Sequence, residues 1–295
     1  VVGIRKNDEV LVSSSTNIAD ALAVYHNDGI PIPIDSDPNT WNLDVNELEK
    51  KITKKTKAIL PTHFLGLPAD MLKIMKIAKR YKLKVIEDCA QSPDAKIHGR
   101  KVGSFGDLGC YSFYSNKIIT TGEGGMVVTN NYKYYKKLIY LKNLAFGKPR
   151  FFHKVDGYNF RLGSLQAALG LSQLKKVRKF IKKKRNIAKL YFKYLKNVEG
   201  IRLPFIHKDY YNVYWMFGIQ ITKECKKNRT QLIKFLNNNN IETRTFFCPL
   251  NLQPFLKKIK NYKKNKCPVA NRMWHEGIYL PSGNNLKKNE VKKIC

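Results

Sequence analysis

The 295-residue chain has few acidic residues and no long apolar run. No stretch approaches the roughly 18 consecutive apolar residues that a membrane-spanning helix requires. Residues 1–6 have neither the apolar centre nor the cleavage site of a secretory signal. We therefore expect a soluble, cytoplasmic protein with no membrane partner. A hydrophobic share of 43% is enough to form a large core and argues against disorder of the whole chain.

The shortage of acids leaves a large positive charge. Lysine and arginine total 55 against 22 aspartate and glutamate residues, which gives a formal net charge of +33. Such a charge can indicate a nucleic-acid partner. However, 44 of the 55 are lysines dispersed over predicted helix faces, and asparagine is abundant too. Base recognition relies on arginine forks and aromatic stacking, and neither is clustered on one element. We expect no nucleic-acid partner, although an anionic small substrate fits the charge.

The sequence also lacks a metal-binding pattern. Its six cysteines lie at wide, irregular spacings, without a Cys-x-x-Cys pair or a nearby histidine pair. This spacing excludes a recognisable zinc site, and we expect no metal. In a chain of this size without a secretion signal, reduced thiols are expected and a disulfide framework is not.

Residues 8–130 alternate short β-rich runs with amphipathic helical patterns. The predicted strands are 9–13, 32–35, 58–61, 84–87, 109–114 and 125–129, and the predicted helices between them are 18–25, 45–52 and 69–81. This alternation is typical of an α/β sheet covered by helices on both faces.

The second half of the chain follows a different pattern. After an aromatic loop at 151–158, apolar residues keep helical spacing from 164 to about 195, which predicts one long helix. A boundary near residue 200 precedes a strand at 214–222, a helix at 229–236 and a strand at 243–247. We predict a large α/β domain (1–163), a connecting helix (164–199) and a smaller C-terminal α+β domain (200–295). Because the chain lacks an initiator methionine and ends inside an amphipathic segment, we expect truncation at both ends.

Two segments carry residues suited to chemistry. In Val85–Gln91 a buried type of strand ends in Glu87 and Asp88, and the carboxyl ends of strands are where ligands bind in α/β sheets. The second segment, 103–125, contains Ser112 and then Lys117 ahead of a glycine-rich turn. Glycines allow backbone to pass close to a bound ring or phosphate. Alone, Asp88 could simply cap a turn and Lys117 could be a surface lysine.

Both segments resemble the DegT/DnrJ family of nucleotide-sugar aminotransferases. The resemblance continues in order along nearly the whole chain, through segments 61–70, 157–162, 166–170 and 280–283. It implies the fold of the pyridoxal 5'-phosphate (PLP)-dependent transferases, fold type I: a large, mainly parallel sheet domain and a smaller C-terminal domain. Residues 116–125 look most like the C-4 aminating perosamine and viosamine synthase type.

The resemblance assigns roles to individual residues. Lys117 would be the catalytic residue and would bind the cofactor aldehyde covalently. Asp88 would pair with the pyridine nitrogen and keep it protonated. Gln91 would bind the ring hydroxyl and Ser112 the phosphate. Asn159 resembles a residue that reaches the phosphate from a neighbouring subunit, so the resemblance also implies a homodimer with active sites at the subunit interface.

Several further residues are candidates for substrate binding. His63 follows a predicted strand end, but a structural, hydrogen-bonded histidine is an equal alternative. Around the aromatic loop, His153, Lys154 and Arg161 could hold a pyrophosphate, and Arg244 could bind a carboxylate or phosphate.

The chain departs from the family pattern at two positions, Asn17 and Asn251. Asn17 stands where many relatives have an aromatic residue that stacks on the ring, and Asn251 stands where histidine is frequent. The residue that stacks on the PLP ring therefore stays open, and so do the sugar contacts of the loop that contains Asn251.

The resemblance predicts transfer of an amino group from L-glutamate to the 4-keto group of a nucleotide-linked 4-keto-6-deoxyhexose. Three alternatives stay open: amination at C-3, a sugar dehydratase on the same fold, and a non-catalytic binding protein. Lys117 argues against the dehydratase, because those relatives carry histidine at the corresponding position. The nucleotide carrier and the stereochemistry of the product are not specified by the sequence.

Overall fold

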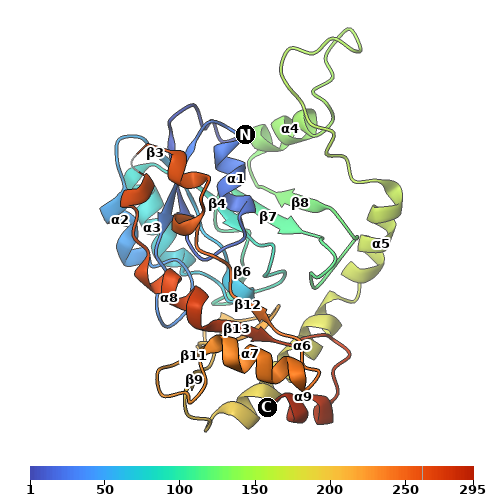
Figure 1. The fold of residues 1–295 in the computed structure, drawn as a ribbon. Helices are drawn as coiled ribbons and strands as arrows, with labels where there is room; N and C mark the ends of the chain where they lie inside the picture. The colour runs from blue at the N-terminus through green and yellow to red at the C-terminus, as the bar shows by residue number, and fades with distance from the viewer. Residues whose placement is uncertain (261) are drawn as a thin grey trace.

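The computed structural model describes residues 1–260 and 262–295. Its main feature is a six-stranded sheet with the order β2-β1-β3-β4-β7-β8 (Figure 1). Neighbouring strands from β2 to β7 are parallel, and β8 pairs antiparallel with β7. The strands are β1 Glu9–Ser13, β2 Ile30–Ile34, β3 Thr56–Leu60, β4 Lys84–Asp88, β7 Leu108–Ser112 and β8 Gly125–Val128. The predicted strands are confirmed to within a few residues.

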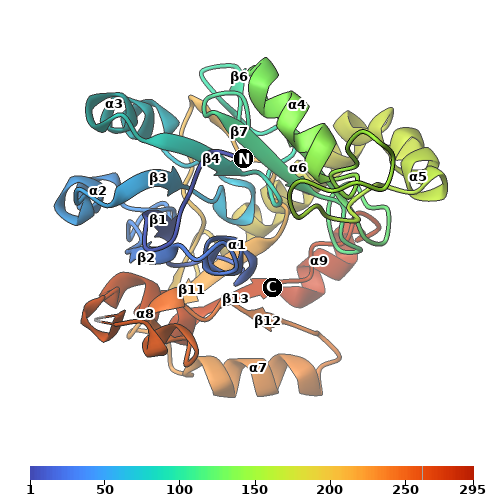
Figure 2. The same cartoon turned by 90° about the horizontal axis from the view of Figure 1, so that it is seen from above.

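Helices cover both faces of this sheet, as the alternation predicted. Because side chains alternate along a strand, Leu11 and Ile59 lie on one face, in a core cluster with residues of α2 and α3. Val10 and Ala58 lie on the other face, in a cluster with residues of α1 and of the segment 250–262. Figure 2 shows α2 and α3 together on one side of the strands. The helices are α1 Ala19–Tyr25, α2 Val45–Lys51 and α3 Met71–Tyr81.

An antiparallel sheet with the order β12-β13-β11-β9 forms the C-terminal layer. It packs against α6, α7 and α9 around Tyr191, Phe217 and Ile278. Its strands are β9 Ile201–Arg202, β11 Phe217–Ile221, β12 Arg244–Thr245 and β13 Gly277–Leu280. Its helices are α6 Val177–Leu195, α7 Arg229–Asn238, α8 Pro268–Glu276 and α9 Lys288–Ile294. The predicted domain boundaries at 163 and 199 stay a prediction.

Short elements connect the two layers. A small sheet with the order β10-β5-β6 joins the β5–β6 hairpin of the first half to a strand of the second half. Its strands are β5 Lys96–Ile97, β6 Arg100–Lys101 and β10 Tyr210–Tyr211. Within the described residues, 3-10 turns lie at Phe64–Gly66, Leu250–Leu252, Leu256–Lys258 and Tyr262–Lys264.

The prediction of one helix from 164 to 195 is wrong. The segment forms α5 Ser164–Leu174 and a separate α6, with a break at Lys175 and Lys176. The Lys176 N–H bonds to the Gln173 carbonyl three residues back, and Lys176 has φ −106° and ψ 0°. A single tightened turn of this kind redirects the chain without glycine or proline. The apolar spacing continues across the break, so no feature of the sequence predicted it.

The region after β7 packs little against the rest of the chain. Neither α4 Tyr132–Leu141 nor α5 has a buried residue, and the segment between them projects from the body (Figure 1). Among the described residues, no helix combines the length and apolar character needed to cross a membrane.

Candidate active site

The candidate site lies where the strand order changes direction. The chain runs from β1 to β2 on one side and then crosses to β3 on the other, so the carboxyl ends of β1 and β3 diverge. In open α/β sheets such a switch point forms a crevice for ligands. Asp88 ends β4, Thr62 follows β3, and Asp20 lies in the first turn of α1, which follows β1.

Asp88 at the end of β4 and Lys117 in the turn after β7 influence each other electrostatically. Burial raises the pKa of Asp88, while the Ala90 amide and the Lys117 amine act in the opposite direction. Asp88 Oδ1 accepts a hydrogen bond of 2.8 Å from the Ala90 N–H. Burial in turn lowers the pKa of Lys117, against the raising effect of Asp88 and Asp20. A lysine with a lowered pKa is neutral more often and is therefore a better nucleophile and base.

The turn that carries Lys117 is anchored on both sides of it. The Lys117 N–H bonds to the Tyr114 carbonyl at 3.0 Å, and the next two residues, Ile118 and Ile119, are buried. The turn then closes through Gly122 and Gly124, which have φ of +80° and +134°. Residues with a side chain rarely adopt this backbone region, so the glycines are required there.

Trp215 covers the Lys117 amine from the C-terminal layer. Lys117 Nζ lies 4.2 Å from the centroid of the Trp215 ring, within the range of a cation–π contact. The Trp215 indole N–H donates to the Asn116 carbonyl at 2.8 Å, which ties the two layers together beside Lys117. Sequence reasoning missed Trp215, because a residue about 100 positions away gives no local signal of contact.

Gln91 and Ser112 lie on the same side of the sheet as Asp88. The side-chain carbonyl of Gln91 accepts from the Leu65 N–H at 2.7 Å, which leaves its amide NH2 as the group that can donate. Ser112 ends β7, two residues beyond Cys110, which is paired with Asp88 across the strands. Both side chains are polar groups at the carboxyl edge, where a ligand binds.

His63 takes part in a buried network instead of facing the crevice. Its Nδ1 accepts from the Ala69 N–H at 3.0 Å, so the ring proton is on Nε2, which donates to Glu87 at 3.2 Å. Burial acts to raise the pKa of Glu87, but hydrogen bonds from His63 and from the backbone at Gly103 and Gly106 hold it below its usual value. Both ring nitrogens of His63 are thus used inside the protein.

The remaining predicted residues lie outside the crevice in this chain. His153, Lys154, Asn159 and Arg161 are exposed on the projecting segment 142–163 (Figure 1). His153 Nδ1 lies 2.7 Å from the Leu144 carbonyl, and Arg161 donates to Asn143 at 3.4 Å. Arg244 is exposed on β12 and forms an ion pair of 2.6 Å with Glu242.

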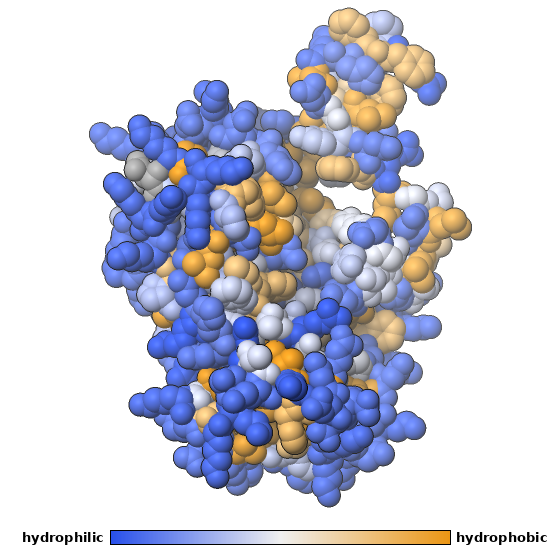
Figure 3. Space-filling view, viewed as in Figure 1, coloured by the Kyte–Doolittle hydropathy of each residue, from blue (hydrophilic) through white to orange (hydrophobic). Residues whose placement is uncertain are grey.

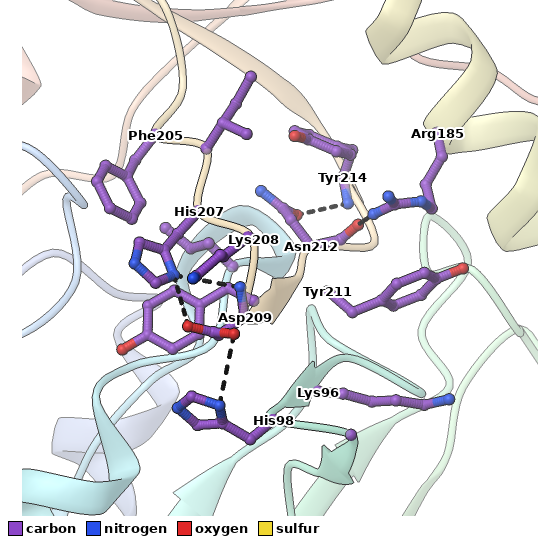
Figure 4. A pocket seen from close by; sticks show the side chains of 14 residues that line it. Lys96, His98, Arg185, Phe205, His207, Lys208, Asp209, Tyr211, Asn212 and Tyr214 are labelled. Atoms are coloured by element: carbon purple, nitrogen blue, oxygen red, sulfur yellow. Dashed lines mark hydrogen bonds and ion pairs between the residues drawn. The ribbon is translucent and has the colours of Figure 1, made fainter.

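A separate cavity of about 540 Å³ lies between β5 and the segment 205–214 (Figure 4). Asp209 stands between His98 and His207, 3.6 Å from a ring nitrogen of each. The lysine and arginine residues that line the cavity are Lys96, Arg185 and Lys208. None of the residues predicted for the cofactor or substrate site lines this cavity. Since lysine and arginine make up 55 of 295 residues, three in a cavity of this size are expected by composition alone.

Comparison with known proteins identifies the family. The family model for DegT/DnrJ/EryC1/StrS aminotransferases matches residues 1–295. The chain belongs to this family. It is therefore a PLP-dependent transaminase, and the predicted family and fold class are confirmed.

Individual relatives cover the chain from end to end. The GDP-perosamine synthase of Escherichia coli O157:H7 is 40% identical over 295 residues, which is 100% of this chain and 79% of the relative. That of Vibrio cholerae is 36% identical, over 100% of this chain and 80% of the relative. A crystal structure of S. venezuelae DesV in complex with a ketimine intermediate superposes with a TM-score of 0.92 at 30% identity, covering 99% of this chain and 78% of DesV.

The residues at the crevice fit PLP. The ring nitrogen of the cofactor needs an anionic partner, its aldehyde needs an amine, and its ring hydroxyl and phosphate need donors. Asp88 would supply the first and Lys117 the second, and the charge of each affects the pKa of the other. Gln91 and Ser112 offer an amide and a hydroxyl at the same edge.

Proposed function

We propose that this chain transfers an amino group from L-glutamate to the 4-keto group of a nucleotide-linked 4-keto-6-deoxyhexose. The observation that carries this proposal is that Asp88 ends β4 and Lys117 lies in the turn after β7, where the charge of each group affects the pKa of the other. Three relatives at 34–40% identity are GDP-perosamine synthases, which supports amination at C-4. A 3-aminotransferase of Acidithiobacillus ferrooxidans that acts on a UDP-linked sugar is 34% identical, so amination at C-3 is the second candidate.

Each residue of the crevice has a defined task in this reaction. Bound PLP supplies an electron sink for the carbon that loses its proton and a carrier for the amino group. Lys117 Nζ would hold the cofactor aldehyde, and its amine would take up and return the proton of the substrate carbon. Asp88 accepts from the protonated ring nitrogen. Gln91 donates to the ring hydroxyl, and the Ser112 hydroxyl donates to the phosphate.

A homodimer completes the site in this proposal. The face formed by β8, α4, the projecting segment and α5 exposes large apolar side chains (Figure 3), with Leu165 86%, Phe160 72% and Phe151 70% exposed. Several large apolar side chains exposed in one region of the surface favour a protein interface there. Asn159 lies on the same face, which supports its contribution to the phosphate site of a neighbouring copy.

The substrate contacts follow from that arrangement. His153, Lys154 and Arg161 share the projecting segment with Asn159, so a neighbouring copy can present them to the pyrophosphate of the nucleotide sugar. A substrate-binding role is less well supported for Arg244 and His63. Arg244 forms an ion pair with Glu242, and both ring nitrogens of His63 already have hydrogen-bond partners in the protein. The six free cysteines support a reducing, cytoplasmic location.

The test is a substrate panel. The protein is incubated with PLP, L-glutamate and GDP-, UDP- or dTDP-linked 4-keto-6-deoxy sugars, and the nucleotide sugars are analysed by mass spectrometry and NMR. We expect an aminated sugar and an equal amount of 2-oxoglutarate, with the new nitrogen on C-4. The Lys117→Ala variant should form neither product. Nitrogen on C-3 would establish the second candidate, and no product with any sugar would contradict the proposal.

A further inference from the structure

Glu87 is a buried carboxylate that the proposed reaction does not use. It lies on β4 directly before Asp88, and none of its side chain is exposed. Four hydrogen-bond donors surround its two oxygens. Oε1 accepts from the Phe105 and Gly106 N–H groups, both at 2.7 Å, and Oε2 accepts from the Gly103 N–H at 2.7 Å and from His63 Nε2 at 3.2 Å. Burial of a carboxylate is costly unless its oxygens are paired in this way.

The four donors come from segments on either side of β4. Segment 103–106 precedes β7, the strand that leads to Lys117, while His63 follows β3. Asp107 extends the attachment, because its carboxylate accepts from the Val85 N–H at 3.0 Å. Glu87 therefore joins the last turn of chain before Asp88 to the segments that flank it in the sheet.

The backbone of Asp88 is held by the same network. The Asp88 N–H donates to the Pro61 carbonyl at 2.9 Å, and the Asp88 carbonyl accepts from the His63 N–H at 3.2 Å. His63 thus holds Asp88 through its backbone and Glu87 through its ring. Because successive side chains of a strand point to opposite faces, Glu87 anchors β4 from one face while the Asp88 carboxyl projects from the other.

We propose that Glu87 is a positioning residue that acts through Asp88: with His63 it clamps the end of β4, so that the Asp88 carboxylate keeps the orientation that pairs with the cofactor ring nitrogen. Glu87, His63 and segment 103–106 form this Glu87 clamp. The role toward the ring rests on the proposed function, whereas the clamp does not. With the clamp open, Asp88 would hold the binding orientation only part of the time, and the apparent dissociation constant of PLP would rise by the inverse of that fraction.

Glu87→Gln opens the clamp with little change of shape. Glutamine has one side-chain oxygen, and its NH2 group must replace either Oε1 or Oε2. Each of these oxygens accepts from two donors, so two donors face the NH2 group in either orientation. The His63 ring cannot adapt by moving its proton, because Nδ1 already accepts from the Ala69 N–H at 3.0 Å. A buried donor without an acceptor is destabilising.

The first test is amide hydrogen exchange of the full chain without PLP, followed by NMR. In the wild type we expect slow exchange of the three amides of segment 103–106 that donate to Glu87. In Glu87→Gln at least one of them should exchange about tenfold faster. The Lys73 amide, which donates to the Asp70 carboxylate at 3.1 Å, is the matched control and should exchange equally in both proteins. Unprotected amides in the wild type, or equal exchange in both proteins, would overturn the clamp.

The second test measures PLP binding by titration, at a temperature where circular dichroism shows that each variant is folded. Glu87→Gln should raise the PLP dissociation constant about tenfold, which corresponds to an oriented Asp88 about a tenth of the time. Tyr191→Phe is the control for lost stability alone. It removes a hydrogen bond of 2.7 Å from a buried tyrosine to Pro281 in the C-terminal layer, and it should keep the dissociation constant within about twofold.

Action through Asp88 predicts that the effect of Glu87→Gln depends on Asp88. In an Asp88→Ala background, Glu87→Gln should change the PLP dissociation constant less than about twofold, because no carboxylate remains to be oriented. A merely structural role would give the same factor in both backgrounds. That result, or an unchanged dissociation constant in Glu87→Gln alone, would overturn the positioning role.

If Glu87→Gln does not fold, the wild type decides. A clamp that strengthens PLP binding about tenfold must itself be strengthened about tenfold by PLP, because coupling between two equilibria is reciprocal. The three amides of segment 103–106 should then exchange about tenfold more slowly with PLP, relative to the Lys73 amide. Equal slowing at both places would overturn the positioning role. A wild type that binds no PLP would contradict the proposed function, and exchange without PLP would still decide the clamp.

Discussion

The two sides of strand β7 differ sharply in how far their residues are buried. Toward β4, the chain buries Asp88 and Gln91 and gives their side chains hydrogen-bond partners. Toward β8, three of the four residues of the strand are exposed, and α4 and α5 have no buried residue. One chain therefore encloses the proposed cofactor-binding residues Asp88 and Gln91 but leaves the adjoining surface of β8, α4 and α5 exposed. This contrast leads to the proposal that a second copy covers that surface.

Replacement of Lys117 by alanine tests the complete side most strongly. The variant loses both the covalent anchor and the proton carrier, so kcat should fall about 10⁴-fold or more, the upper range for general acid–base catalysis. Initial rates of 2-oxoglutarate formation measure this loss. Lys54→Ala, at an exposed position, should retain the wild-type rate. Substantial residual turnover in Lys117→Ala would mean that another group performs the chemistry.

Asp88→Asn keeps the shape of the side chain but removes its charge. Loss of one member of a buried charge pair costs about 3–5 kcal/mol, which corresponds to roughly 10²- to 10⁴-fold in rate. We expect kcat to fall by that factor while the protein remains folded, as measured by steady-state kinetics and circular dichroism. A wild-type kcat in the variant would show that the ring nitrogen needs no anionic partner here.

Leu165→Glu tests the open side. Leu165 is 86% exposed on α5, and a carboxylate placed in an interface without a partner weakens association. A cost of about 3 kcal/mol raises the dimer dissociation constant about 10²-fold. Sedimentation equilibrium should show monomers at concentrations where the wild type is dimeric. Leu72→Glu, on α3 with 45% exposure, is the matched control and should stay dimeric. A wild type that is monomeric at all concentrations would refute the dimer.

Trp215→Phe should have the smallest effect, because Trp215 joins the C-terminal layer to the turn that carries Lys117 and has no proposed part in the chemistry. The ring over Lys117 is kept, while the hydrogen bond from the indole N–H to Asn116 is lost. One such bond contributes about 1 kcal/mol, so kcat/KM should fall about fivefold. Trp274→Phe, on α8, serves as the control. An unchanged kcat/KM would show that the Trp215 contact does not position Lys117.

The sequence predicted the sheet better than the site. Strand positions followed from runs such as Glu9–Ser13, because burial on both faces imposes a visible pattern. The break at Lys176 was invisible, since it interrupts hydrogen bonding and not the apolar spacing. Asp20 was overlooked as one polar residue of a predicted helix, although its place just after β1 put it at the carboxyl edge. Contacts between Lys117 and Trp215 depend on the packing of two layers, which no local pattern encodes.

The central claim is that Lys117, among 44 lysines, is the residue that binds the cofactor. Borohydride reduction of the protein with one equivalent of PLP, followed by peptide mass spectrometry, tests it directly. The account predicts a single reduced cofactor adduct on Lys117, and none there in the Lys117→Ala variant. An adduct spread over surface lysines, or one located at a different single lysine, would contradict it.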